Sequence, residues 1–231
     1  CIGFMIGTGG SALVSYTLGT GDKEKANRYF SMMVYFTILA GILLTVLGII
    51  FVRPMAELFG ADESMMDTCV LYGRIVIAFN AAFMLQNIFQ SFFVVAEKPR
   101  LGLIVTIAAG VTNMVLDALF VGVFKWGIVG AALATGISQS IGGLLPLLYF
   151  ALPNNSPLQL TRTGFELAPL LKASSNGCSE LMSNVASSLI GIVYNYQLMR
   201  LGGENAVATY GVLMYIQFVF IAIFIGYSVG S

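Results

Sequence analysis

The sequence predicts an all-α, polytopic transmembrane helix bundle, and three features of its composition support this fold class. Hydrophobic residues make up 58% of the 231 residues, whereas charged residues make up 10%, against about 25% in typical soluble domains. The charges gather in short polar gaps, and the apolar runs between them reach the roughly 20 residues that a membrane-spanning helix needs. The net charge is zero, so nothing points to a nucleic-acid partner.

Seven apolar runs are predicted to be transmembrane helices. They cover about residues 1–18, 29–52, 68–95, 101–124, 128–152, 173–199 and 206–231. The chain opens on Cys1 within one apolar run and closes within another. We therefore expect it to be a piece of a longer protein.

The first run contains Gly7-Thr8-Gly9-Gly10, which resembles a phosphate-binding loop. No strand precedes this stretch, and no Lys-Ser or Lys-Thr pair follows it, so the pattern of such a loop is incomplete. Small residues at four-residue spacing let membrane helices approach one another closely. We therefore predict that these glycines serve helix packing.

Turn residues in the polar gaps predict where the runs begin and end. Gly19-Thr20-Gly21 ends the first run, and Asp22 is placed to cap the second. Arg53-Pro54 is predicted to end the second run, with residues 55–60 forming a short amphipathic turn at the membrane surface. Trp126 follows the fourth run as an interfacial anchor.

Residues 153–172 form the only long linker and are predicted to separate two helix bundles. The predicted organisation is residues 1–152 with about five transmembrane helices, then the linker, then residues 173–231 with about two. The gaps on the linker's side of the membrane hold most of the basic residues, namely Lys23, Lys25, Arg28, Lys98, Arg100, Arg162 and Lys172. The opposite side holds Arg53, Lys125 and Arg200. Because basic loops stay in the cytoplasm, the linker is predicted to be cytoplasmic.

Two strongly polar residues, Asn113 and Asp117, lie inside the fourth run, Leu101–Phe124. Their spacing of four residues places them on one face of a helix. A carboxylate in hydrocarbon costs several kcal/mol unless it faces a bundle interior or a wet cavity. The organising residue of the predicted site is therefore Asp117.

Two roles for Asp117 remain open from the residues alone. It could form a structural pair with Arg74, the basic residue inside a neighbouring run. Alternatively it could bind an exchangeable cation, with oxygens from Asn113 and from Thr135 on the following antiparallel helix. Na⁺ would use this oxygen set, whereas H⁺ would need only Asp117.

Other polar residues inside the runs are candidates for a substrate cavity. They are Gln86, Asn87, Gln90, Gln139, Glu180, Asn184 and Asn195. The last three follow one helical face with Ser187 and Gly191. Each of these side chains could instead bridge neighbouring helices, a role worth about 0.6 kcal/mol on average in membrane bundles.

Nothing in the sequence predicts an enzyme. There is no histidine, which removes the usual zinc ligand and the usual general base. Cys1, Cys69 and Cys178 are isolated and are interpreted as small apolar fillers. No nucleophile–base arrangement is visible, and no cofactor is expected.

Several motifs, in this order and spacing, resemble the multidrug and toxic compound extrusion (MATE) family. They are Gly7-Thr8-Gly9-Gly10-Ser11, Leu18-Gly19-Thr20-Gly21-Asp22, Ala96-Glu97-Lys98-Pro99, Asn113-x-x-x-Asp117, the stretch 127–135 and the stretch 202–208. The resemblance implies twelve transmembrane helices in two six-helix lobes, of which this chain would span from within the second helix to within the eighth. It also implies a cation site at Asn113, Asp117 and Thr135, with a further Asp upstream of Cys1.

The resemblance implies a secondary active exporter, which exchanges Na⁺ or H⁺ for drugs or other organic, often cationic, compounds. The expected partners are a small organic molecule and the lipid bilayer, with no obligate protein partner, and the expected location is the inner membrane of a bacterium. Two alternatives stay open. A flippase for lipid-linked sugars of the same wider fold should have more basic residues in its cavity, and a non-transporting membrane scaffold should hold Asp117 paired with Arg74.

Overall fold

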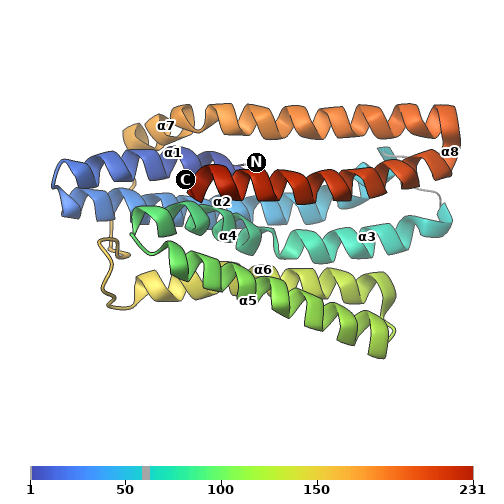
Figure 1. Ribbon diagram of the computed structural model, residues 1–231, viewed down its shortest axis with the longest axis horizontal. Helices are drawn as coiled ribbons and strands as arrows, with labels where there is room; N and C mark the ends of the chain where they lie inside the picture. Colours follow the sequence, from blue (N-terminus) through green and yellow to red (C-terminus); the bar gives the residue numbers. More distant parts are fainter. Residues whose placement is uncertain (1, 59–62, 231) are drawn as a thin grey trace. The chain divides into compact units, whose positions relative to one another are not determined.

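The computed structural model describes residues 2–58 and 63–230, and every regular element in these two ranges is a helix (Figure 1). This confirms the predicted all-α class. The chain divides into two compact units, Cys1–Leu181 and Met182–Ser231.

The first unit contains seven α-helices, one π-helical segment and the start of an eighth α-helix. They are α1 (Ile2–Gly19), α2 (Lys23–Leu58), α3 (Glu63–Ala78), α4 (Asn80–Val95), α5 (Pro99–Asp117), the π segment η1 (Ala118–Val123), α6 (Gly127–Ala151), α7 (Leu167–Asn176) and the first residues of α8 (Cys178–Gly230). The fifth predicted run, residues 128–152, matches α6 to within one residue at each end.

Three described helical stretches are long and apolar enough to cross a membrane: most of α2, α5 together with η1, and α6. The bent pair α3–α4 makes a fourth if it is one broken span. The other predicted runs are helical in α1 and α8, but they do not meet this criterion among the described residues. The count of seven spans therefore stays a prediction.

The third predicted run is not one continuous helix. The helices α3 and α4 meet at Phe79 with a bend of 42°. The Phe79 ring packs on Gly136 of α6 so closely that a Cβ atom at residue 136 would lie 2.1 Å from the ring. This contact between distant segments accounts for the position of the break, and no local helix-breaking residue marks it.

The predicted end of the second run at Arg53-Pro54 is also wrong. The helix α2 continues through Pro54 to Leu58. A proline costs its helix one donor and crowds the preceding turn, but here only one further helical turn follows it. The predicted surface turn at residues 55–60 is thus helical as far as Leu58, and its last two residues lie outside the described ranges.

The core of the first unit is an aromatic cluster that joins α2, α4 and α6. Phe30 contacts Phe92 and Phe150 with ring centroids 4.8 Å and 5.0 Å apart. Phe89 stacks on Phe150 at 5.7 Å, and all four rings are fully buried. Edge-to-face and stacked rings add stabilisation beyond the area that they bury.

The glycines of α1 let neighbouring helices approach closely. A Cβ atom at Gly3 or Gly7 would lie within 3.1–3.3 Å of the backbone or side chains of α4. At Gly9 it would lie 1.9 Å from the carbonyl oxygen of Ala173 in α7, and at Gly177 it would lie 1.9 Å from the carbonyl oxygen of Met5. The predicted packing role of the glycines is therefore confirmed.

The segment between α6 and α7 is non-helical and lies along the start of α2. The backbone N–H of Gln159 donates to Asn27 Oδ1 at 3.0 Å, and that of Thr161 donates to Ser31 Oγ at 2.8 Å. Leu158 between them is fully buried. The helix α7 begins at Leu167, inside the predicted linker, because Pro169 in its first turn needs no backbone hydrogen bond. The division into lobes at residues 153–172 stays a prediction.

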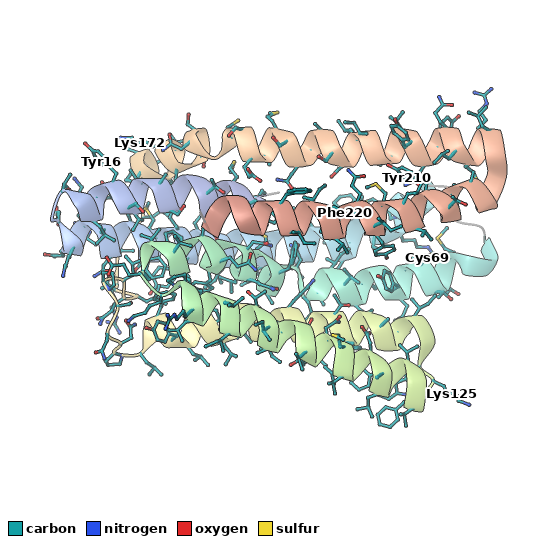
Figure 2. All side chains as sticks on the ribbon, in the orientation of Figure 1. Tyr16, Cys69, Lys125, Lys172, Tyr210 and Phe220 are labelled. Atoms are coloured by element: carbon teal, nitrogen blue, oxygen red, sulfur yellow. The ribbon has the colours of Figure 1, made fainter. Side chains whose placement is uncertain are left out.

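The basic gaps that the sequence assigns to one side of the membrane meet at one end of the first unit. Arg28 pairs with Glu166, and Lys98 lines a pocket with Asn154 and Asn155. These contacts join the α1–α2 turn and the α4–α5 turn to the linker. Lys172 and Lys125 lie at opposite ends of this unit (Figure 2), in agreement with the alternation of gaps.

The second unit is a helical hairpin formed by the two arms of α8. The chain leaves helical geometry at Gly203, which has a φ of 64° and a ψ of −160°. This positive φ favours glycine. Tyr194 and Tyr210 stack across the hairpin with ring centroids 5.5 Å apart. The predicted gap at residues 200–204 thus contains the turn.

Candidate functional site

The predicted cation site lies between α5 and α6. These helices pack side by side and are joined by a tight turn in which Lys125 and Gly127 both have a φ of 56°. Across the pair, Asn113 Nδ2 lies 3.5 Å from Thr135 Oγ1 and donates to it. Both residues are half-buried. The structure therefore brings together the amide and the hydroxyl that the sequence predicts to be close.

Asp117 lies one turn beyond Asn113 at the last position of α5. Its Oδ1 atom is buried and has no hydrogen-bond partner among the described residues. Burial of a carboxylate oxygen without a donor or a cation is costly. This unsatisfied oxygen is the strongest indication that the site takes a ligand.

The predicted alternative, a structural pair between Asp117 and Arg74, does not form. Arg74 is exposed on α3, and within residues 2–58 and 63–230 Asp117 makes no ion pair. A carboxylate held permanently in a dry interface would need such a partner. The structure therefore favours the second of the two roles that the sequence leaves open.

The backbone changes from α-helix to π-helix immediately after Asp117. In η1 the turn widens, and the N–H of Phe124 donates to the carbonyl oxygen of Leu119 at 2.9 Å. The segment is held against α6 at Gly130, where a Cβ atom would lie 2.9 Å from Phe120. Short π segments are rare and often occur at functional sites. Nothing in the apolar run of residues 118–123 distinguishes it from an α-helix, so sequence reasoning missed it.

The site offers oxygen atoms only: the Asp117 carboxylate, the Asn113 amide oxygen and the Thr135 hydroxyl. Oxygen ligands suit hard cations. Three side chains are fewer than such an ion takes, so backbone, water or further residues would have to complete the shell. No group of three or more His, Cys, Asp or Glu side chains suited to a transition metal occurs in the described part of the chain.

Four predicted cavity residues, on α4 and α6, take different positions. Asn87 is buried and donates to the carbonyl oxygen of Phe83 at 2.8 Å. Gln86 packs over Gly142, where a Cβ atom would lie 2.7 Å from its amide carbon. Gln139 is half-buried and Gln90 is exposed. The contact of Gln86 joins α4 to α6. The hydrogen bond of Asn87 stays within α4, and Asn87 also lines a pocket of about 200 Å³ between α1, α2 and α4.

The remaining three predicted cavity residues belong to α8. Glu180 and Asn184 are half-buried in its first arm. Asn195 is exposed and lines a pocket of about 640 Å³ within the second unit, together with Tyr210, Tyr215 and Phe218. This pocket is mainly apolar, and the sequence pattern of the first arm alone does not predict it.

A family model described as MatE matches residues 1–119 of the chain, which include Asn113 and Asp117. The match covers more than half of the sequence. The chain belongs to the MatE family. Membership confirms the resemblance drawn from the motifs and, with the apolar helices, indicates an integral, multi-pass membrane protein.

Two relatives show how much of such a protein the chain represents. A "Multidrug export protein MepA" of Staphylococcus saprophyticus is 25% identical over 91% of this chain and 47% of its own length. A "Probable multidrug resistance protein YoeA" of Bacillus subtilis is 29% identical over 98% of this chain and 52% of its own length. The chain thus spans about half the length of the curated relatives that it matches.

Solved structures confirm the fold. An outward-facing multidrug resistance MATE family transporter of the MOP superfamily superposes with a TM-score of 0.87 at 20% identity, over 97% of this chain and 50% of its own length. A MOP superfamily transporter from Pyrococcus furiosus, described as having a binding pocket of reverse polarity that suggests a different function, gives a TM-score of 0.84 at 20% identity, over 94% of this chain and 48% of its own length. At these identities the likeness is one of fold alone.

Proposed function

We propose that the chain is part of a secondary active exporter in which Asp117 binds the coupling cation, Na⁺ or H⁺. The observation that supports this most strongly is the buried Oδ1 atom of Asp117, which lacks a hydrogen-bond partner in the described part of the chain. Asn113 and Thr135, joined to each other at 3.5 Å, would supply further oxygens to Na⁺. For H⁺ the carboxylate alone would suffice.

The proposed substrates are drugs or other organic, often cationic, compounds, and the proposed location is the inner membrane of a bacterium. The names of the relatives from Staphylococcus and Bacillus support both proposals. In this arrangement residues 1–152 form part of an amino-terminal lobe, residues 153–172 a cytoplasmic linker and residues 173–231 the start of a carboxy-terminal lobe. The cavity roles of the predicted polar residues belong to the same proposal; these residues are Gln86, Asn87, Gln90, Gln139, Glu180, Asn184 and Asn195.

Coupling requires that cation and drug favour different states of the transporter. A ligand that binds two conformations equally shifts no equilibrium. Binding of the cation at Asp117 would satisfy the unpaired oxygen in one state, and release of the cation would accompany drug binding in the other. The π segment η1 continues α5 directly after Asp117, and its backbone hydrogen bonds differ from those of α5.

The test is drug efflux by the full-length protein in proteoliposomes, driven by an imposed Na⁺ or H⁺ gradient. Asp117→Asn keeps the size of the side chain and removes its charge, and should abolish gradient-driven efflux. Asp67→Asn, at an exposed position on α3, is the matched control and should transport normally. Unchanged efflux by Asp117→Asn would remove the carboxylate from the mechanism.

A further inference from the structure

A polar pocket of about 580 Å³ lies where the start of α5 meets the end of α6 and the linker. It is lined by Lys98, Leu101, Tyr149, Leu152, Pro153, Asn154 and Asn155. The pocket is at the opposite end of the α5–α6 pair from the turn at Lys125, and none of its residues belongs to the proposed cation site. It therefore needs an explanation of its own.

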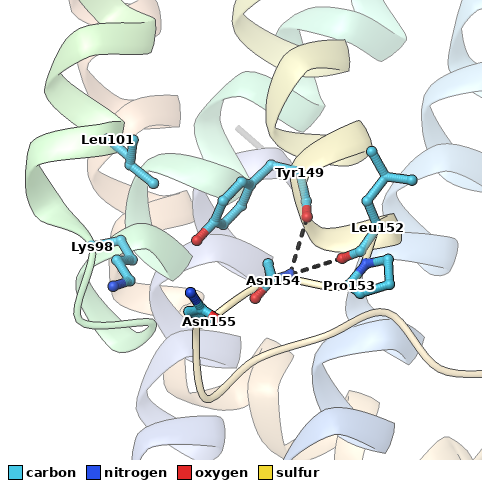
Figure 3. A pocket seen from close by; sticks show the side chains of 7 residues that line it. All are labelled: Lys98, Leu101, Tyr149, Leu152, Pro153, Asn154 and Asn155. Atoms are coloured by element: carbon cyan, nitrogen blue, oxygen red, sulfur yellow. Dashed lines mark hydrogen bonds between the residues drawn. The ribbon is translucent and has the colours of Figure 1, made fainter.

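Three hydrogen-bond donors face the space inside this pocket. They are the Lys98 amine, the Tyr149 hydroxyl and the Asn155 amide, and Figure 3 shows these side chains among those that line the pocket. Within the described residues, no hydrogen bond or ion pair occupies any of these three groups. Lys98 is the one charged residue of the lining. The pocket thus presents one positive charge and two neutral donors.

The surrounding structure holds these donors in place. The Tyr149 ring packs against Phe93 and Phe150, with ring centroids 6.2 Å and 5.1 Å away. Asn154 fixes the loop: its amide nitrogen donates to the carbonyl oxygens of Tyr149 and Leu152, and its side-chain oxygen accepts from the backbone N–H of Ser156. The Tyr149 ring and the loop that carries Asn155 are therefore held in place, which lowers the cost of binding a ligand.

Positive charge and convergent donors select an anion with several acceptor oxygens, and phosphate is the common biological group of this kind. The helix α5 also begins here, with Lys98 as the residue before its first turn and Pro99 at its start. The positive end of the helix dipole adds to the attraction for an anion. Arg100, in the same first turn, is exposed beside the pocket.

The apolar surface next to the pocket indicates that the phosphate belongs to a lipid and not to a soluble molecule. Leu152 in the lining is 62% exposed, and Leu103 and Ile104 of α5 are 60% and 59% exposed about one helical turn away. These side chains would contact acyl chains while the pocket holds the headgroup. We propose that this pocket binds the phosphate headgroup of an anionic phospholipid at the end of the α5–α6 pair.

The test is lipid binding to the full-length transporter in detergent, measured by native mass spectrometry with added phosphatidylglycerol. Lys98→Gln should weaken binding about tenfold, as expected for a charge-assisted contact. Tyr149→Phe, which removes only the hydroxyl, should weaken it about threefold. Lys98→Arg should restore most of the affinity. The matched control is Lys172→Gln, at an exposed lysine of α7, and it should bind as the wild type does.

Each other outcome overturns the proposal. Equal binding by the wild type, Lys98→Gln and Tyr149→Phe would mean that lipid does not occupy the pocket. Equal losses from Lys98→Gln and Lys172→Gln would mean that general surface charge is responsible. Competition by millimolar inorganic phosphate as effective as that by phosphatidylglycerol would assign the pocket to a soluble phosphate. If the Lys98 variants fail to fold, Tyr149→Phe decides the question: weaker binding of phosphatidylglycerol supports the proposal, and wild-type binding overturns it.

Discussion

Two carboxylates of the first unit, Glu166 and Asp117, have opposite surroundings. Glu166 lies at the end of the linker, is 45% exposed and accepts from Arg28 at 2.5 Å. Asp117 lies within the α5–η1 helical stretch, and its buried Oδ1 atom has no partner among the described residues. The more exposed acid therefore has a partner, whereas the half-buried acid has a buried oxygen without one.

The difference extends to the polar residues around each acid. Near Glu166, polar groups of the linker are paired with the start of α2, as the contacts of Gln159 and Thr161 show. Around Asp117, the nearest polar contact is the long 3.5 Å approach of Asn113 to Thr135. Completed hydrogen bonds stabilise a fold, whereas an unsatisfied buried group marks a place where stability is given up for function. Four predictions test this contrast.

The largest effect is expected at Asp117. Asp117→Asn should reduce gradient-driven efflux to the level of liposomes without protein, and at the same time leave the melting temperature unchanged or raise it, because an unpaired buried charge is destabilising. Thermal unfolding of the full-length protein in detergent, without Na⁺, measures the second quantity. A clear fall in melting temperature, absent in Asp67→Asn, would show that the carboxylate has a structural partner.

In the linker, a substitution at Asn154 should lower the stability of the protein and leave ion-coupled efflux unchanged, the reverse of the effects expected at Asp117. Asn154→Ala removes two donated hydrogen bonds and the acceptor for Ser156, so the free energy of unfolding should fall by about 2 kcal/mol, with the Na⁺ or H⁺ dependence of efflux unchanged. Denaturation by SDS measures the stability. The neighbouring Asn155→Ala is the matched control, because no described hydrogen bond uses its side chain, and it should leave the unfolding curve in place.

A smaller effect on coupling is expected at Thr135. If Na⁺ is the coupling ion, Thr135→Ala should weaken the apparent affinity for Na⁺ by about threefold to tenfold, as expected for the loss of one neutral ligand, and Thr135→Ser should retain it. The dependence of efflux on Na⁺ concentration gives the result. Identical curves for the wild type and Thr135→Ala would assign the hydroxyl to helix packing.

The smallest effect on stability is expected for the ion pair between Arg28 and Glu166. Arg28 and Glu166 are 48% and 45% exposed, so their coupling energy should be below about 1 kcal/mol and should shrink at high salt. A double-mutant cycle of Arg28→Gln and Glu166→Gln measures it. A coupling energy of several kcal/mol would mean that this exposed ion pair strongly stabilises the fold. That result would contradict the contrast between Glu166 and Asp117.

The sequence predicts those parts of this structure that depend on local pattern. The apolar run and its flanking glycine predict α6 closely. The four-residue spacing predicts that Asn113 and Asp117 share one face of α5, and Asn113 reaches Thr135 from that helix. The break at Phe79 depends on the contact of its ring with Gly136, which is more than fifty positions away in the sequence. No local sequence pattern predicts such a contact. The π turn after Asp117 depends on how residues 118–123 pack on α6, so apolar composition could not distinguish it from α-helix.

Direct binding of the coupling ion tests the central claim. The full-length protein in detergent would be titrated with radioactive Na⁺ at equilibrium, and in parallel the protons bound per molecule would be counted with a pH indicator. The wild type should bind one of the two ions saturably, and Asp117→Asn should lose that binding while Asp67→Asn keeps it. Saturable binding of the same ion by Asp117→Asn, with wild-type affinity, would contradict the account.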